Sequence, residues 1–423
     1  MKKLLFIVTL LSLTVANVAE AQFWKRKKEE PPKRRPVQTI KTEEKKEPSK
    51  LKKKREIEYP KTVIKSRYRI DVLLSLYLDE LVKDNKPVYK NYFPDKAVAG
   101  INLYEGIKLA ADTLSKQGYN LDIHIHDITQ AGLSPEQIVK ENILDGSDLI
   151  IGGVQSYQIK PIADYAKKHQ INFISMLSPA DADVTNNPYF TILQPTLVTH
   201  IKKLRADIFK KYPGKNIFLF YRTTPDVDST AFKYAWEDEE KNFKRLLVNK
   251  MPTFSLLEKM FDSTETNIIF MPIVDYSYSQ NLIEELYTLF PDYSFEVYGL
   301  PSWRFMSKLK KADAYPNVGV NYSNPFYYDM NNKYCLDIAN AYKANFAGKI
   351  TELSLRGYEA TMWYAYLLKR YGTVFNEKLR DNHITFSKYE VFSQWTTDND
   401  LLYNENTHYY IYRYQGGSFM ISE

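Results

Sequence analysis

Cysteine is nearly absent from this sequence. Cys335 is the only one among 423 residues, so the chain cannot form an internal disulfide bond in any compartment. Cys335 falls in a segment with helical periodicity, and no paired His or Asn marks it as a nucleophile. We therefore predict that Cys335 is a buried, small apolar residue.

The sequence also lacks the short motifs that mark common catalytic sites. It contains no G-x-S-x-G, H-E-x-x-H, Walker A or G-x-G-x-x-G pattern. His124 and His126 alternate on an expected strand beside Asp127, but a zinc site would need a third ligand that the sequence does not indicate. We expect histidines at a strand end there, no metal, no cofactor and no enzymatic activity.

Long apolar runs are missing except at the N-terminus. Residues 1–22 have a basic start, an apolar run at 4–15 and a small-residue site at 19–21, which predicts a signal peptide cleaved before Gln22. The run is short for a membrane span, and no cysteine follows it that could carry a lipid. We expect an exported, soluble protein of the periplasm.

Positive charge is confined to one segment. Residues 23–69 hold 19 Lys and Arg against 7 Asp and Glu, whereas residues 70–423 carry a net charge of −6 within a total of +7. This distribution argues against a nucleic-acid partner, because the basic residues would then lie on a folded face. Residues 23–66 have few apolar side chains and are predicted to be a disordered linker. It either touches peptidoglycan or an anionic membrane surface, or acts as a solubilising spacer.

Residues 121–178 show what kind of fold the rest of the chain adopts. Short β-branched runs alternate with amphipathic helical runs, which is typical of parallel βαβ units. Glycine and serine gather where the runs at 149–152 and 172–175 end, as in GGVQS and SMLS. The carboxyl ends of strands are where open α/β sheets bind ligands.

The same alternation restarts after residue 193 and predicts a second lobe. The 357 residues from Arg67 onward are too many for one ordinary core. Predicted strands cover 67–76, 121–126, 149–152, 172–175, 189–193, 216–221, 267–273, 295–299 and 318–322, with β-rich stretches near 389–395 and 408–414. Predicted helices cover 97–117, 134–144, 160–169, 197–212, 230–243, 280–290, 331–346 and 357–371.

We therefore predict an α/β clamshell of two lobes, each a mostly parallel sheet flanked by helices. The chain crosses the hinge several times. Lobe I takes residues 67–193 and about 300–380. Lobe II and the hinge segments take residues 194–299 and about 381–423.

The order of these pieces resembles the type I periplasmic binding protein family, in particular the branched-chain amino-acid receptors of ABC transporters. The resemblance covers residues 67–420 and depends on DGSDLIIGGVQS, SMLSPADADVT, YFTILQPTLVTHIKKL and RGYEATMWYAYLLKR in that order. It implies two lobes that close on a small polar ligand, which is then presented to an ABC permease or a sensor. The expected ligand-binding residues are Ser156, Ser178, Ala180, Asp181, Arg222, Asp226, Tyr276 and Trp303.

Several of these residues have a second interpretation. Ser156 could cap a helix, Asp181 could cap a turn, and Arg222 could be an ordinary surface arginine. The sequence departs from the amino-acid receptors at Ala182, where they commonly have threonine, and at residues 299–303, which contain no acid. An alternative function is therefore an envelope interaction protein that uses the same fold to dock a cell-wall component or a protein partner.

Overall fold

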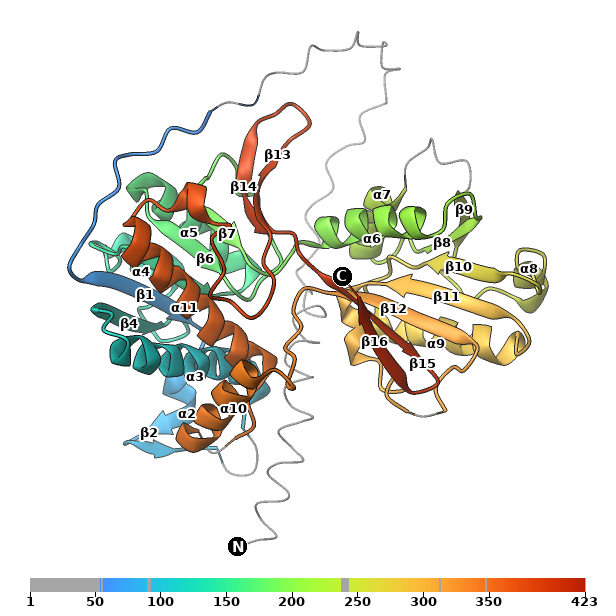
Figure 1. The fold of residues 1–423 in the computed structure, drawn as a ribbon, viewed down its shortest axis with the longest axis horizontal. Helices are drawn as coiled ribbons and strands as arrows, with labels where there is room; N and C mark the ends of the chain where they lie inside the picture. The colour runs from blue at the N-terminus through green and yellow to red at the C-terminus, as the bar shows by residue number, and fades with distance from the viewer. Residues whose placement is uncertain are drawn as a thin grey trace, which may run out of the picture.

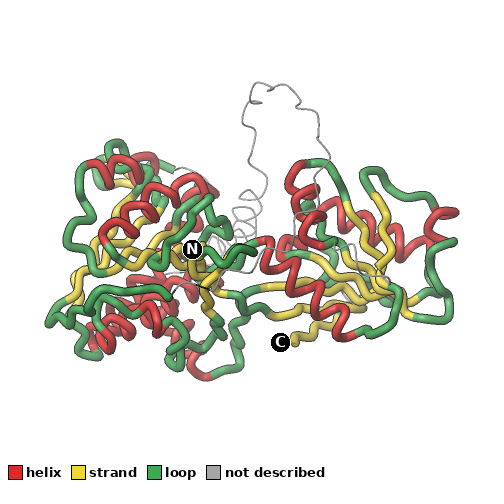
Figure 2. The backbone as a smooth tube through the Cα atoms, turned by 90° about the horizontal axis from the view of Figure 1, so that it is seen from above, coloured by secondary structure: helices red, strands yellow, loops and turns green. Residues whose placement is uncertain are grey.

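The computed structural model consists of two lobes lying side by side, each a sheet between layers of helices (Figures 1 and 2). The structure describes residues 54, 56–89, 93–236, 243–311, 313–346 and 348–422. The predicted signal peptide and most of the predicted linker lie outside these residues. Within them, no helix is both long and apolar enough to cross a membrane.

The lobe I sheet is built around five parallel strands. Its order is β13-β14-β7-β6-β5-β1-β4 among the described residues. β14 runs parallel to β7, and β13 pairs antiparallel with β14 at the edge. The strands are β1 (Tyr68–Leu74), β4 (Leu121–Asp127), β5 (Leu149–Gly153), β6 (Asn172–Ser175), β7 (Phe190–Ile192), β13 (Val391–Trp395) and β14 (Leu401–Asn406).

The lobe II sheet repeats this arrangement. Its order is β16-β15-β12-β11-β10-β8-β9 in the part of the chain that is described, again with five parallel strands followed by a hairpin. Here the hairpin strand β15 is antiparallel to β12. The strands are β8 (Ile217–Tyr221), β9 (Phe243–Leu247), β10 (Thr266–Phe270), β11 (Ser294–Gly299), β12 (Val318–Asn324), β15 (Tyr410–Gln415) and β16 (Ser418–Ser422).

Helices cover both faces of each sheet. In lobe I, α3 (Asp95–Lys116), α10 (Lys333–Asn345) and α11 (Glu352–Tyr371) cover one face, and α4 (Pro135–Lys140) and α5 (Ser156–His169) cover the other. In lobe II, α6 (Leu197–Lys211) and α7 (Asp226–Ala235) lie opposite α8 (Phe254–Glu258), α9 (Tyr276–Leu289) and the 3-10 turn η1 (Pro301–Phe305). Smaller elements are α2 (Leu78–Leu81), β2 (Val82–Lys83), β3 (Lys86–Pro87) and η2 (Asn376–Lys378).

Period-two alternation explains how each strand contributes to two cores. In β1, Ile70, Val72 and Leu74 pack against α3 and α11, while Leu73 packs toward α5. The helices α3 and α11 approach closely through glycine. A Cβ at Gly106 would lie 1.9 Å from the carbonyl oxygen of Ser354. The small residues of α3 therefore serve packing between helices as well as packing on the sheet.

Three connections join the lobes within the described residues. Residues 193–196 lead from β7 to α6, residues 325–332 lead from β12 to α10, and residues 407–409 lead from β14 to β15. The predicted partition differs from these pairings, because β12 belongs to lobe II beside β11 and the β13–β14 hairpin belongs to lobe I beside β7. A strand pattern does not name its partner, so the sequence could not assign the segments that follow each crossing.

The predicted linker also ends earlier than expected. Residues 56–66 lie along lobe I. The hydroxyl of Thr62 donates to the carbonyl of Tyr371 at 2.7 Å, and the ring of Tyr59 packs edge-on against Tyr189. These contacts are hydrogen bonds and ring packing, which a composition argument based on low hydrophobicity does not detect.

Cys335 lies on α10 with 1% of its surface exposed, as predicted. Burial raises the pKa of its thiol to about 11, so the thiol stays protonated at neutral pH. Only the thiolate is the reactive form. The placement is therefore that of a packing residue.

Candidate functional site

The strand order creates a switch point in each lobe. In lobe I the order reverses between β1 and β5, and in lobe II it reverses between β8 and β10. Helices that follow the two strands at such a point lie on opposite faces, which leaves a crevice outside their carboxyl ends where α/β proteins bind ligands. Ser156 follows β5, while Arg222 and Asp275 follow β8 and β10.

Ser156 is the first residue of α5 and is partly exposed. It is not the helix cap, because Gln155 occupies the N-cap position and its backbone N–H donates to the side chain of Gln158 at 2.8 Å. Helix capping therefore does not require the Ser156 hydroxyl. Of the two interpretations from sequence, the capping one is wrong.

Ser178, Ala180 and Asp181 form one loop after β6. The backbone N–H of Ala180 donates to the hydroxyl oxygen of Ser178 at 3.2 Å, and Ser178 is fully buried. The carboxylate of Asp181 accepts from the backbone N–H of Asp183 and from the hydroxyl of Tyr403 on β14, each at 3.3 Å. The loop is thus held to lobe I through side chains that the sequence analysis assigned to a ligand.

Arg222 is part of a half-buried charge cluster in lobe II. Its side chain is 14% exposed, lies 4.3 Å from the centre of the Tyr278 ring and approaches Asp228 at 3.3 Å and Asp275 at 3.6 Å. Burial raises the pKa of Asp228 to about 6, although the backbone N–H of Val274 and the charge of Arg222 favour its ionised form. Arg222 is therefore not an ordinary surface arginine.

The other residues predicted in lobe II lie in different surroundings. Asp226 is exposed at the start of α7, and Tyr276 opens α9 with its ring 5.8 Å from that of Phe305. Trp303 is 0% exposed within the core of lobe II. A Cβ at Gly299 would lie 2.0 Å from its ring, so glycine is required where the indole covers β11. The Trp303 ring is a core group, and the next residue, Arg304, is the one that reaches the other lobe.

The residues that join the two lobes at this level were not predicted from the sequence. Glu352, the first residue of α11 in lobe I, accepts from Nη2 of Arg356 at 2.5 Å and pairs with Nη1 of Arg304 in lobe II at 3.1 Å. Arg356 is buried and donates through Nη1 to the carbonyl of Met176, just after β6. These three charged side chains therefore join α11 and the carboxyl end of β6 in lobe I to the turn that follows β11 in lobe II.

Burial alone would raise the pKa of Glu352, but the charges of Arg304 and Arg356 outweigh it and hold that pKa below its ordinary value. The carboxylate is therefore ionised at neutral pH. The only sign of these residues in the sequence was the RGYEATMWYAYLLKR segment, which contains Arg356. Nothing in the pattern indicated that Arg304 would contact α11.

Aromatic side chains surround this junction. The Arg356 guanidinium lies 3.9 Å from the centre of the Phe326 ring, and the hydroxyl of Tyr412 donates to the carbonyl of Phe326 at 2.9 Å. The Tyr322 ring lies 5.5 Å from that of Tyr412, and the Tyr327 ring 6.2 Å from it. The β12–α10 crossing is therefore anchored by aromatic rings from lobe II.

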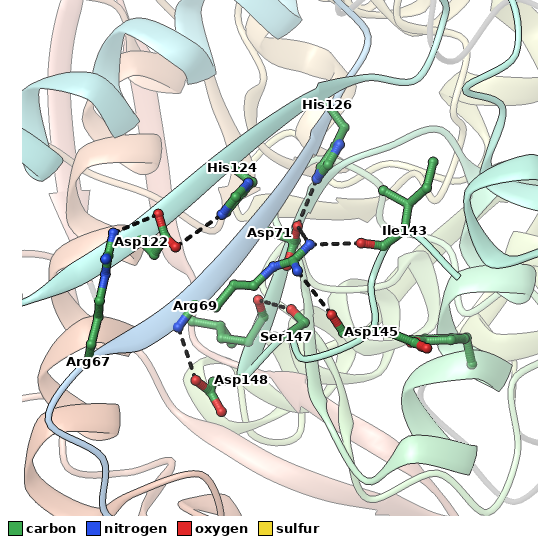
Figure 3. Close-up of polar contacts among 12 residues, drawn as sticks. Arg67, Arg69, Asp71, Asp122, His124, His126, Ile143, Asp145, Ser147 and Asp148 are labelled. Atoms are coloured by element: carbon green, nitrogen blue, oxygen red, sulfur yellow. Dashed lines mark hydrogen bonds and ion pairs between the residues drawn. The ribbon is translucent and has the colours of Figure 1, made fainter. Parts of the chain in front are cut away.

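The histidines on β4 have structural partners. Figure 3 shows Arg69, Asp71 and His126 converging from β1 and β4, with Asp71 accepting from Nε of Arg69 and lying 2.8 Å from Nε2 of His126. Burial of Asp71 favours its neutral form, yet hydrogen bonds from His126 and Arg69 hold its pKa below the ordinary value. Among the described residues, no group of three or more His, Cys, Asp or Glu is placed to hold a metal ion.

Solved structures share this architecture. A protein from Rhodospirillum rubrum described as a branched-chain amino acid ABC transporter is 13% identical, with a TM-score of 0.59 over 84% of this chain and 99% of that one. This match identifies the fold. The chain adopts the type I periplasmic binding protein fold.

An ABC transporter substrate-binding protein from Desulfitobacterium hafniense in complex with leucine is 15% identical, with a TM-score of 0.51 over 84% of this chain and all of that one. Full-length LpoA from Haemophilus influenzae is 13% identical, with a TM-score of 0.54 over 86% of this chain and 60% of that one. No family model and no curated protein matches the sequence.

Proposed function

We propose that the protein is a solute-binding protein of the periplasm that closes its two lobes on a small polar ligand, amino-acid-like or other. The ion pair between Glu352 of lobe I and Arg304 of lobe II is the observation that carries this proposal. A ligand there can contact both lobes at once, and only such differential contacts favour a closed state over an open one. The substrate-binding proteins that share the fold support the same conclusion.

The partners in this proposal are the ligand and the ABC permease or sensor that reads the closed form. Ser156 and the loop from Ser178 to Asp181 form the lobe I side of the site. Arg222 and Tyr276, which follow β8 and β10, form the lobe II side. No catalytic step is part of the proposal. Ala182 and the absence of an acid at residues 299–303 make a free aliphatic amino acid a poor fit.

Native mass spectrometry of protein purified from the periplasm tests this function directly. We expect a co-purifying small molecule and a ligand-induced rise in the melting temperature from one class among amino acids, peptides, nucleosides and sugars. Ser156→Ala should weaken binding of that ligand, while Ser115→Ala, an exposed change on α3, should not. No bound molecule and no thermal shift from any class would count decisively against the proposal.

The likeness to LpoA favours a second candidate, an envelope docking protein that binds a cell-wall component or a protein partner. The basic residues 23–66 would then add avidity by touching peptidoglycan or an anionic membrane surface. Pull-down on purified peptidoglycan, with the full chain and with a chain lacking residues 23–53, separates the two roles. Equal retention of both chains would show that the basic segment does not contribute to peptidoglycan binding.

A further inference from the structure

The junction between the lobes pairs two arginines with one shared carboxylate. Two guanidinium groups, one from each lobe, contact the single carboxylate of Glu352. Each oxygen of this carboxylate accepts a hydrogen bond from one arginine. Arg356 cannot turn away to solvent because its side chain is buried and its Nη1 is bonded to the carbonyl of Met176. Removing Glu352 from this position would take away the carboxylate that both arginines contact.

The arrangement also leaves a donor unused. The Nε of Arg356 is buried and has no hydrogen-bond partner among the described residues. A buried polar group without a partner costs free energy, more so when it carries charge. A planar anion with two or more oxygens can bond several guanidinium N–H groups at once and also balances their charge, which a neutral or cationic group does not.

We propose that the interlobe site takes an anionic group, a carboxylate or a phosphate, which replaces the carboxylate of Glu352 between Arg304 and Arg356. This inference rests on the proposed function and narrows its ligand class. In the unliganded chain, Glu352 makes the same contacts that the ligand makes later, so it holds the lobes together and competes with the ligand.

The competition has a measurable consequence. A ligand that must displace an internal carboxylate binds with an apparent affinity reduced by the fraction of molecules in which the site is free. Removing the Glu352 charge should therefore open the lobes in the absence of anion and strengthen the binding of added anion. Removing Arg304 should open the lobes and abolish the anion response, because the lobe II contact is lost.

The test uses protein purified from the periplasm, with glutarate and inorganic phosphate as separate probes at constant ionic strength. For Glu352→Gln we expect a larger radius of gyration by solution scattering and its return to the wild-type value on addition of a probe. The midpoint concentration for that return, also followed by melting temperature, should be about tenfold lower than the midpoint for the wild-type thermal shift. The probe that acts at lower concentration identifies carboxylate or phosphate as the recognised group.

The matched control is Glu390→Gln, which removes another carboxylate at the hinge, 3.6 Å from Lys203 of lobe II. It should leave the radius of gyration and the midpoints unchanged. Identical behaviour of Glu352→Gln and wild type, or a full anion response in Arg304→Gln, would overturn the inference. If Glu352→Gln fails to give a folded circular-dichroism spectrum, Glu352→Asp, which shortens the reach and keeps the charge, must shift the midpoint in the same direction.

Failure of this inference is distinguishable from failure of the proposed function. A neutral or cationic molecule found by native mass spectrometry would leave solute binding intact and refute only the anionic class. An empty protein that responds to no solute of any class would remove both.

Discussion

The two lobes have the same strand order but differ in what their strands are made of. β1 and β8 occupy equivalent places, each second from the edge of its parallel sheet. β1 contains the ion pair of Arg69 with the fully buried Asp71, whereas β8 reads IFLFY with no charged residue. The neighbouring edge strands, β4 and β9, both carry charge but differ in its sign and partners.

On the lobe I edge, β4 places Asp122 3.1 Å from Arg67, and His126 lies against Asp71. On the lobe II edge, cations of β9 and its neighbours lie over aromatic rings, as with Arg245 4.0 Å from the centre of the Trp236 ring. In both lobes the edge strand carries charged side chains, which discourage pairing with another chain. The two lobes therefore show that the βα alternation sets the strand order, whereas different kinds of side chain can occupy equivalent positions in the sheet.

The largest expected effect is on the aromatic packing of lobe II. Trp303→Ala should lower the free energy of unfolding by about 4 kcal/mol, because the buried indole leaves a cavity over Gly299. Trp395→Ala, at a partly exposed tryptophan on the lobe I edge strand β13, serves as the control and should cost much less. Calorimetry that resolves the unfolding transitions measures both. A loss below about 1 kcal/mol for Trp303→Ala would show that lobe II does not depend on this ring.

The next effect is on the buried charges of lobe I. Asp71→Asn should lower the free energy of unfolding by about 3 kcal/mol, because it breaks the pair with Arg69 and the contact with His126 inside the sheet. Asp122→Asn, whose partner Arg67 is exposed, should change it by less than about 1 kcal/mol. Chemical denaturation measures both variants. Equal losses would mean that burial does not distinguish the two pairs.

A third prediction concerns the pH dependence of stability that comes from a buried acid in lobe I. Burial raises the pKa of Glu359 on α11 to about 7, against 4.5 as its ordinary value, although backbone N–H groups of Phe386 and Ser387 donate to it. The folded state therefore holds more protons than the unfolded state between these values. The stability contributed by the neutral acid is lost as pH rises from about 4.5 through about 7, on the order of 3 kcal/mol. Glu359→Gln should remove this decline in a series of denaturation curves, and a persistent decline would contradict the assignment.

The smallest effect at neutral pH comes from a buried histidine in lobe II. Its contribution to stability is lost as pH falls, not as pH rises. Burial lowers the pKa of His200 on α6 to about 3, from an ordinary value of 6.5. The unfolded state then binds more protons, so the contribution is present above about pH 6.5 and is lost as pH falls toward 3. His200→Phe should flatten the acid limb of the same curves and leave stability at pH 7 nearly unchanged. A steep acid limb in the variant would assign that limb to other groups.

Much of the fold could be predicted from the sequence. The pattern predicted β6 at 172–175 with its exact bounds and placed α6 and α11 within a few residues, because apolar spacing is a local property. It missed β9, β14 and β16 and placed β12 in the wrong lobe. β9 and β16 are short strands at sheet edges, and β14 pairs with β7, which lies in the first half of the chain.

The candidate site was predictable only in part. Glycine and serine were correctly expected at the carboxyl ends of β5 and β6, and their role in ligand binding stays a prediction. The hypothesis that Trp303 faces a ligand did not anticipate its burial, since an aromatic residue after a strand fits either place. Arg304, Glu352 and Arg356 could not be found as a set. The first is separated from the others by 48 and 52 positions, and only a chain that returns to lobe I brings them together.

The sequence by itself determined the alternation of strands and helices, the separation of a basic N-terminal segment from an acidic remainder, and the single buried cysteine. These follow from spacing and composition, which are read along the chain. Only the tertiary structure decided which lobe each late strand joins and that a carboxylate of one lobe lies between arginines of both. Those facts depend on long-range contacts, whose free energy comes from groups that the sequence keeps far apart.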